Sequence, residues 1–206
     1  MKRVGVLLTV WLIGLACVLT PVVSQAVPAS AASAAAGPLV HHKTARLCST
    51  VNKAGHAECF AIRQTDTVQP PGVSPNAVSP NATPTGYGPS ALVAAYKLDQ
   101  TKGVGQTVAV VDAYDDPNAE ADLAVYRAQY GLPACTTANG CFTKVDQRGG
   151  TDYPVPDSGW ATEISLDLDM VSAICPRCSI LLVEANNNAL NNLGIAVNYA
   201  VYPMTR

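Results

Sequence analysis

Two acidic residues, Glu163 and Asp167, lie four positions apart in the stretch GWATEISLDLDMVSAICPRC, residues 159–178. Wound as an α-helix at about 100° per residue, this stretch collects its apolar side chains on one broad arc, which comprises Trp160, Ile164, Leu166, Leu168, Met170, Val171 and Ile174. The opposite face carries Ser165, Asp169 and Ser172. Both acids fall in the middle of the apolar arc, so the pattern predicts that their carboxyl groups face a core.

A pair of acids facing a core indicates chemistry more than surface charge. Like charges buried together are costly and raise at least one pKa, and proteins tolerate them mainly at functional sites or metals. A metal site and a glycosidase pair remain open alternatives. Bundle-type metal sites add histidine ligands, however, and His41, His42 and His56 all precede residue 65. Glycosidase acids flank a cleft at roughly 5 to 9.5 Å, whereas two acids on one helix turn predict a hydrogen-bonded relay.

A relay of two carboxyl groups serves nucleophilic catalysis. One carboxyl takes the proton of the nucleophile and the second orients the first. No histidine follows residue 65, so the region that holds the acids cannot complete a Ser-His-Asp triad. A glutamate base works mainly where the medium is acidic.

Composition indicates one folded domain, and the start of the chain predicts export. Its 206 residues are 14% charged and 49% hydrophobic, which is enough for one domain with a core. A formal net charge of -2 gives no reason to expect nucleic-acid binding. Lys2 and Arg3 precede an apolar run over residues 4–19 that is too short for a comfortable membrane span, and Ser24-Gln25-Ala26 resembles a cleavage site. Residues 1–26 are therefore predicted to be a signal peptide, and the mature protein to be secreted and extracellular, with no membrane association.

The cysteine content also fits an exported protein. Without Cys17 in the signal peptide, six remain in three local pairs: Cys48 with Cys59, Cys135 with Cys141, and Cys175 with Cys178. An even number in an exported chain favours disulfides, although sequence leaves their connectivity open. The alternative of a redox-active CPRC motif is disfavoured, because redox CxxC motifs open a helix and this one closes a helix.

Three regions follow the signal peptide. Residues 27–64 are predicted to be a short cysteine-containing prosegment, and residues 65–86 a linker rich in Pro, Ser and Asn. From residue 87, helices alternate with apolar strands; helices are expected over 89–98, 116–131, 159–174 and 187–201, and strands over 106–113, 141–147 and 179–185. Asp116 is the expected cap of the second helix. The alternation predicts an α/β layer fold with a parallel sheet.

Residues 87–201 resemble the first half of the catalytic domain of sedolisins, the serine-carboxyl peptidases. The matching pieces are GYGPSALVAAYKL, QTVAVVDAYDDPNAEADL, and the E-I-S-L-D helix followed by CPRCSILLVEA. The resemblance implies a subtilisin-like, three-layer fold with a parallel sheet, here cut short after about three strands, so that residues 87–206 form a partial peptidase domain. It also implies secretion and hydrolysis of peptide bonds at acidic pH by a Ser-Glu-Asp triad with a separate oxyanion-hole Asp.

Individual roles follow from the resemblance. It makes Glu163 the general base, Asp167 its orienting partner and Asp112 a possible supporting carboxylate. Asp112 ends a strand, where α/β sheets place their sites, but a turn or cap role is an equal alternative for this residue. The implied partner is a protein or peptide substrate. No cofactor and no metal ligand are expected in this chain, because the calcium site of the family lies in the part without a counterpart here, and a folded chain is expected to be a monomer.

The resemblance leaves the nucleophile without a counterpart. Ser158, Ser165, Ser172 and Ser179 lack the Gly-x-Ser setting that exposes a nucleophile on a tight turn. A base without its nucleophile loses most of its catalytic power. We therefore expect the chain by itself to be an inactive part of a secreted endopeptidase. The alternative is a secreted non-catalytic protein that keeps the scaffold and binds a peptide or partner.

Overall fold

A computed structural model describes residues 43–65 and 87–204 of the chain. The predicted signal peptide and all but the first residue of the predicted linker lie outside these residues. No helix within the two described ranges is both long and apolar enough to cross a membrane.

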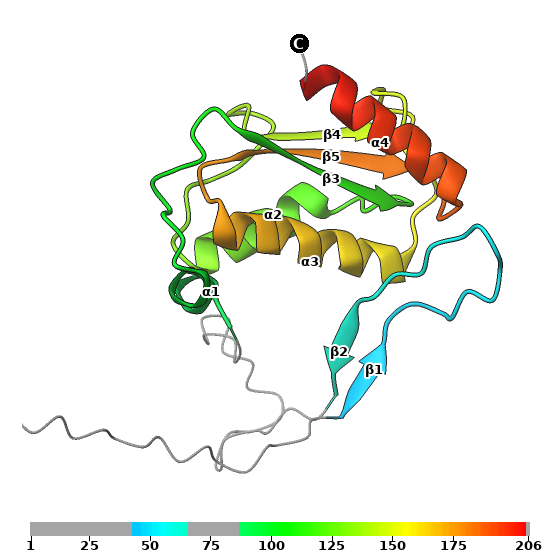
Figure 1. Cartoon of the computed structure of the whole chain (residues 1–206), viewed down its shortest axis with the longest axis horizontal. Coiled ribbons are helices and arrows are strands. Elements are labelled where there is room, and N and C mark those ends of the chain that lie inside the picture. The colour runs from blue at the N-terminus through cyan, green and yellow to red at the C-terminus, as the bar shows by residue number, and fades with distance from the viewer. Residues whose placement is uncertain (1–42, 66–86, 205–206) are drawn as a thin grey trace, which may run out of the picture. The chain divides into compact units, whose positions relative to one another are not determined.

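A parallel sheet of three strands forms the centre of the 87–204 region (Figure 1). The strands are β3 (Thr107–Ala113), β4 (Phe142–Asp146) and β5 (Ser179–Ala185), in the spatial order β3-β5-β4. Both pairings are parallel, and they align Asp112 of β3 and Asp146 of β4 with Glu184 of β5. β5 lies between the other two strands and is buried from its second residue onward, which explains its near-continuous apolar sequence.

Four helices accompany the sheet: α1 (Pro89–Tyr96), α2 (Ala119–Gln129), α3 (Ser158–Ile174) and α4 (Leu190–Met204). α2 and α3 cover one face and α4 covers the other (Figure 1). Successive strand residues point to opposite faces, so Ile180 and Leu182 pack with Ile164 and Leu168 of α3, while Leu181, Val183 and Ala185 pack with Ala196 and Ala200 of α4. The predicted α/β fold with a parallel sheet is confirmed.

A small hairpin was not anticipated. β1 (Thr44–Arg46) pairs antiparallel with β2 (Ile62–Gln64) in the predicted prosegment. The Cys48–Cys59 disulfide closes the loop between these strands, and Cys135–Cys141 and Cys175–Cys178 are the other two disulfides. All three predicted local pairs are confirmed.

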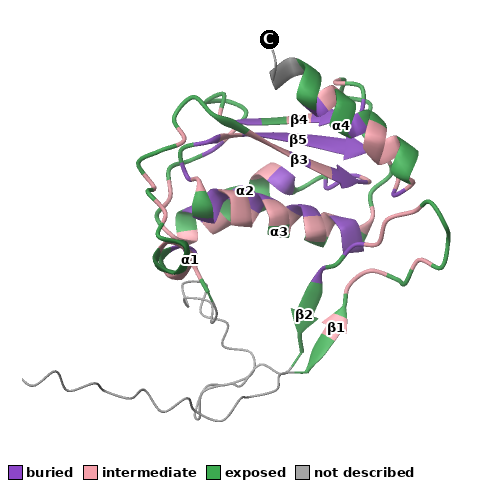
Figure 2. Cartoon of the chain, viewed as in Figure 1, coloured by how far each residue is buried: buried purple, intermediate pink, exposed green. Residues whose placement is uncertain are grey.

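Helix α3 buries a different face from the predicted one. Figure 2 shows buried, half-buried and exposed residues alternating along this helix. Leu166 and Ile174 are 45% and 46% exposed, whereas Ser172 on the predicted polar face is fully buried. The buried stripe of Trp160, Ile164, Leu168 and Ser172 is centred about 120° around the helix from Glu163. Contact with the sheet decides which face is buried, so Glu163 and Asp167 lie at the margin of the stripe and are half-buried.

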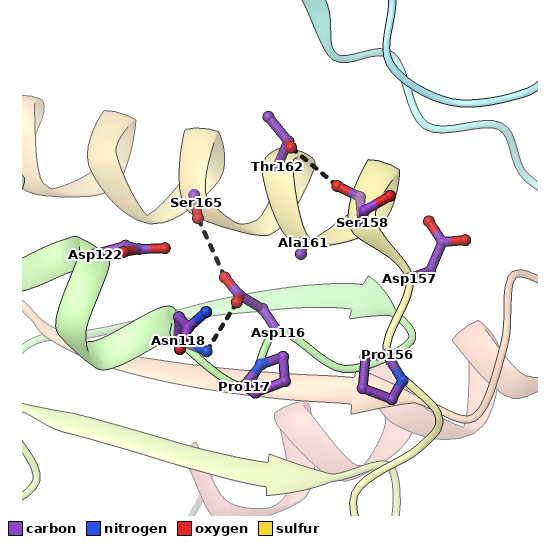
Figure 3. Close-up of a pocket in the computed structure, with 10 residues that line it drawn as sticks. All are labelled: Asp116, Pro117, Asn118, Asp122, Pro156, Asp157, Ser158, Ala161, Thr162 and Ser165. Carbon is purple, nitrogen blue, oxygen red and sulfur yellow. Dashed lines mark hydrogen bonds between the residues drawn. The ribbon is translucent and has the colours of Figure 1, made fainter.

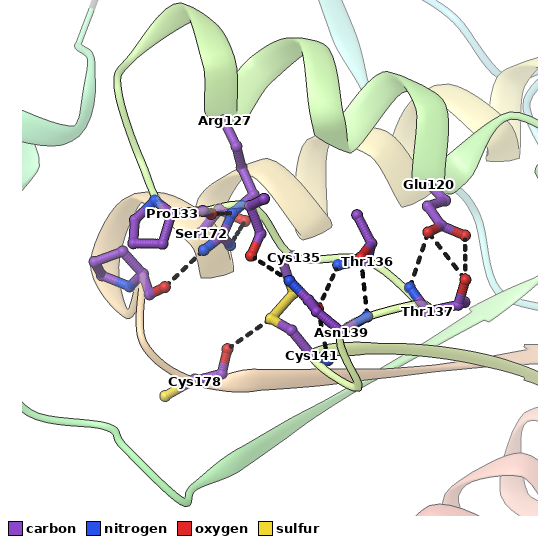
Figure 4. The surroundings of a disulfide bond; sticks show 12 residues. Glu120, Arg127, Pro133, Cys135, Thr136, Thr137, Asn139, Cys141, Ser172 and Cys178 are labelled. Atoms are coloured by element: carbon purple, nitrogen blue, oxygen red, sulfur yellow. Dashed lines mark hydrogen bonds between the residues drawn. A yellow bond between two sulfur atoms is a disulfide. The ribbon is translucent and has the colours of Figure 1, made fainter.

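Arg127 explains how a serine is buried in α3. Its guanidinium is 1% exposed and donates to the carbonyl oxygens of Pro133 (2.5 Å) and Pro176 (2.6 Å) and to the Ser172 hydroxyl (2.9 Å). Figure 4 shows this group beside the Cys135–Cys141 disulfide. Burial lowers the pKa of Arg127, and three neutral oxygens hold its charge. The arginine thereby ties the ends of α2 and α3 together.

Two local expectations about helix ends are wrong. α2 begins at Ala119 without a side-chain cap bond, and the Asp116 carboxylate instead accepts hydrogen bonds from the Asn118 N–H (3.0 Å) and the Ser165 hydroxyl (3.1 Å). One oxygen of the Asp116 carboxylate thus stays with the turn that leads into α2, and the other makes a tertiary contact with α3. Near the other end of the chain, α4 continues to Met204, so residues 202–204 extend the helix that we expected to end at residue 201.

Candidate functional site

The structure brings the three predicted site residues together. Asp112 lies one residue before the end of β3, on the sheet face that α3 covers, since it is two residues from Val110 in the α3-facing core. Asp112 is 5% exposed. Glu163 and Asp167 reach this strand end from adjacent turns of α3. We call Asp112, Glu163 and Asp167 the carboxyl cluster.

Electrostatic coupling links the members of the carboxyl cluster. Burial, together with the negative charges of Asp167 and Glu163, raises the pKa of Asp112 to about 7. Burial and the charge of Glu163 also raise the pKa of Asp167. Carboxyl groups held close to one another cannot all ionise at mildly acidic pH, so the cluster retains at least one proton under those conditions.

Two oxygens of the carboxyl cluster have no partner. Asp112 Oδ2 and Glu163 Oε2 are buried and accept no hydrogen bond. Among the hydrogen bonds of the described residues, none joins Glu163 to Asp167, so the direct relay bond that we predicted is wrong for this structure. Such a bond requires a proton between the two carboxyl groups. The unpartnered Glu163 oxygen is a free acceptor for a proton from another group.

A second set of charges, the lysine cluster, lies beside the carboxyl cluster and was missed by the sequence analysis. Lys144 Nζ of β4 contacts Asp115 Oδ1, Glu184 Oε1 at 3.1 Å and the Asp116 carbonyl oxygen at 2.6 Å. The fully buried Glu184 also accepts the Asp116 N–H at 2.9 Å. Because Glu184 is the register partner of Asp112, the two clusters meet at the carboxyl end of the sheet.

The pKa values of Glu184 and Lys144 are both shifted in the lysine cluster. Burial raises the pKa of Glu184 to about 8, although the Asp116 N–H and the charge of Lys144 act in the opposite direction. Burial lowers the pKa of Lys144, but its contacts with Asp115 and Glu184 outweigh burial, so that this pKa is raised. The sequence did contain a signal for this cluster, because each of two apolar strands carries a charged residue: Glu184 in SILLVEA and Lys144 in CFTKVDQ.

A pocket lies on another side of α3. It has a volume of about 510 Å³ and lies between the starts of α2 and α3, lined by Asp116, Pro117, Asn118, Asp122, Pro156, Asp157, Ser158, Ala161, Thr162 and Ser165 (Figure 3). No member of the carboxyl cluster lines it. Ser165 donates to Asp116 in this pocket, and Ser172 accepts from Arg127, so neither hydroxyl is bonded to Glu163.

Metal binding has no support from the described side chains. Within residues 43–65 and 87–204, no three His, Cys, Asp or Glu side chains are grouped so that they could hold a metal ion. The described residues therefore hold no donor set that fits the calcium implied by the sedolisin resemblance.

The fold and the site define an α/β protein with coupled, half-buried and buried carboxyl groups at the carboxyl end of a parallel sheet. Comparisons with known protein families, with curated proteins and with solved structures give no match to this chain. The resemblance to sedolisins therefore rests on the residues quoted in the sequence analysis alone.

Replacing Glu163 with Gln is expected to lower the pKa of both Asp112 and Asp167, because the negative charge of Glu163 raises both. Carboxyl-carbon NMR titrations of the wild type and of Glu163→Gln would measure the two values. Glu120→Gln is the matched control, since the Glu120 carboxylate bonds Thr137 and is not among the charges that raise the pKa of Asp112 or Asp167. Unchanged titrations of both aspartates would show that the three groups are not coupled.

Proposed function

We propose that Glu163 and Asp167 are the general base and the orienting carboxyl of a secreted serine-type endopeptidase of the sedolisin kind, with a subtilisin-like fold, acting on proteins or peptides at acidic pH. The observation that carries this proposal is the buried, unpartnered Glu163 Oε2 beside two carboxyl groups with raised pKa. The three disulfides support the extracellular part of the proposal, because disulfides persist in oxidising compartments.

The chemistry follows from the positions of the protons. A serine hydroxyl gives its proton to Glu163 Oε2 while its oxygen bonds the scissile carbonyl carbon, and the carbonyl electron pair moves to the oxygen. Glu163 then gives this proton to the leaving amine nitrogen as the carbon–nitrogen bond breaks. Asp167 keeps a proton in acid because its pKa is raised, and it can donate that proton in a hydrogen bond that holds Glu163. Asp112 supports Asp167 through the same coupling.

Among the hydrogen bonds of the described residues, none joins a serine hydroxyl to Glu163. We therefore expect the 206-residue chain to show no peptidase activity by itself. Activity is expected only of a product that also brings a serine of a Gly-rich motif and an oxyanion-hole Asp to Glu163.

The test is hydrolysis of quenched fluorescent peptides between pH 3 and pH 7 by the chain and by any such product. In that product, Glu163→Gln and Asp167→Asn are expected to lower kcat by about 10²-fold or more. Asp169→Asn, two positions along the same helix, is the matched control and should leave kcat unchanged. If no such product is active, or if Glu163→Gln is fully active, the peptidase proposal fails and the non-catalytic alternative takes its place.

A further inference from the structure

We propose that residues 43–65 are a permanent strap of the folded unit and stay docked when the chain is cut between residues 65 and 87. Sequence analysis predicted a prosegment there, but the contacts of this segment are those of an integral part of the fold. The inference concerns the architecture of the mature protein and does not rest on peptidase activity.

Backbone hydrogen bonds attach the strap to the connection between β5 and α4. The Ala57 N–H donates to the Asn188 carbonyl oxygen and the Leu190 N–H donates to the Gly55 carbonyl oxygen, each at 2.8 Å. His56 and Ala189 form an antiparallel bridge between these bonds. The Asn188 side-chain amide adds a bond to the Ala57 carbonyl oxygen at 2.8 Å. This is the geometry in which an extended peptide adds to an exposed backbone edge.

The strap also shares a hydrophobic core with the α/β layer. Cys59 and Ala61 are both 3% exposed and pack with Ala113 of β3 and Trp160 of α3. Trp160 is 7% exposed, and loss of the strap would uncover part of this large ring. Release of the segment would thus expose apolar surface that a stable mature protein keeps buried.

Gly159 in the first turn of α3 fits the close approach of the strap. A Cβ atom at this position would lie 2.6 Å from Cys48 Sγ and 3.0 Å from the Leu47 carbonyl oxygen. The Cys59 sulfur lies 3.6 Å from the Gly159 carbonyl oxygen. Glycine is a poor helix former, so its presence here is explained by the disulfide resting against the helix backbone.

The docked strap contacts the parts of the fold that carry the carboxyl cluster. Gly159 and Trp160 lie one turn before Glu163 in α3. Tyr114, which follows β3 with a left-handed backbone (φ 64°), has its ring centre 6.3 Å from that of Trp160 and donates from its hydroxyl to Asn188 Oδ1 at 3.4 Å. The strap therefore packs beside both the helix that carries Glu163 and the strand end that carries Asp112.

The test begins with the oxidised full chain carrying a recognition sequence for a site-specific protease within residues 66–86. No disulfide crosses the cut, since Cys48–Cys59 lies before it and the other two lie after it. After cleavage, the two pieces are expected to co-elute in gel filtration in native buffer and to separate only in denaturant. Separation in native buffer would overturn the proposal.

Matched glycine variants test the docking geometry. Gly159→Ala is expected to raise the dissociation constant of the cut strap at least tenfold, because the new methyl group meets Cys48. Gly194→Ala in α4 makes the same change where nothing lies within 4 Å of the new atom, and it should leave the strap bound. Equal binding in both variants would refute the docked arrangement.

A second pair of variants tests the docking independently, in case Gly159→Ala does not fold. Asn188→Asp keeps the side-chain shape but removes the donor to Ala57, whereas Asn191→Asp makes the same change at an exposed site. We expect faster hydrogen exchange at the Ala57 and Leu190 amides in Asn188→Asp alone. Exchange as slow as in the Asn191→Asp variant would contradict the assignment of Asn188 to the docking edge.

Discussion

Replacing Asp112 with Asn is expected to stabilise the protein at pH 8 and to flatten its stability between pH 4 and pH 8. Burial and the charges of Asp167 and Glu163 raise the pKa of Asp112 from 3.8 to about 7, so the folded state binds this proton more tightly than the unfolded state. The resulting stabilisation is complete below about pH 3.8 and is lost as the pH rises through about 7. A shift of this size corresponds to at most about 4 kcal/mol.

Urea unfolding of the wild type and of Asp112→Asn at several pH values would measure this effect. The wild type is expected to lose stability toward pH 8, and the variant to be more stable there by about 2 kcal/mol. Asp152→Asn at an exposed position is the control. Asp169 and Glu184, with pKa values raised to about 7 and about 8, leave a residual slope of the same sign. Parallel curves for the wild type and Asp112→Asn would contradict the assignment of a raised pKa to Asp112.

Replacing Lys144 with Met is expected to destabilise the protein by about 3 kcal/mol at pH 7, because buried Asp115 loses its cation and the Asp116 carbonyl oxygen loses its donor. The destabilisation should grow as the pH rises through about 8, where Glu184 ionises and no cation remains to pair with it. Denaturant unfolding of the wild type and of the variant at pH 6, 7 and 9 would measure both effects.

A double variant separates the two acids that Lys144 contacts. Adding Glu184→Gln to Lys144→Met should abolish the growth above pH 8 and leave the loss at pH 7 in place, because Glu184 is the contact of Lys144 whose pKa is raised to about 8. Lys102→Met, at an exposed position, should change the free energy of unfolding by less than about 0.5 kcal/mol. If Lys144→Met lowers the free energy of unfolding equally at pH 6 and pH 9, Lys144 does not stabilise the ionised form of Glu184.

Sequence alone determined the order and type of the elements in residues 87–204. The apolar runs that became β3 and β5 are continuous because a parallel sheet is covered on both faces, so their local pattern already carried the tertiary arrangement. The disulfides were predictable for a similar reason. Each links cysteines close in sequence, with separations of 11, 6 and 3 residues, so no long-range information was needed to pair them.

The tertiary structure decided what local patterns could not. The helical wheel of α3 was ambiguous because its single apolar arc spans roughly 200°, and only the sheet determined that Ile164 and Leu168 are buried while Leu166 is exposed. Asp116 was predicted to cap α2 and instead bonds Ser165, 49 residues away. Arg127 similarly reaches Pro176 across 49 residues.

Part of the charged site was visible in the sequence, and part of it appeared only in the tertiary structure. The spacing of Glu163 and Asp167 and the position of Asp112 at a strand end were visible in the sequence, because each depends on one element. The pairing of Lys144 with Glu184 and the docking of residues 55–57 on Asn188 and Leu190 join separate elements. Their free energies arise from burial and contact between distant parts of the chain, and these exist only once the sheet and helices have packed together.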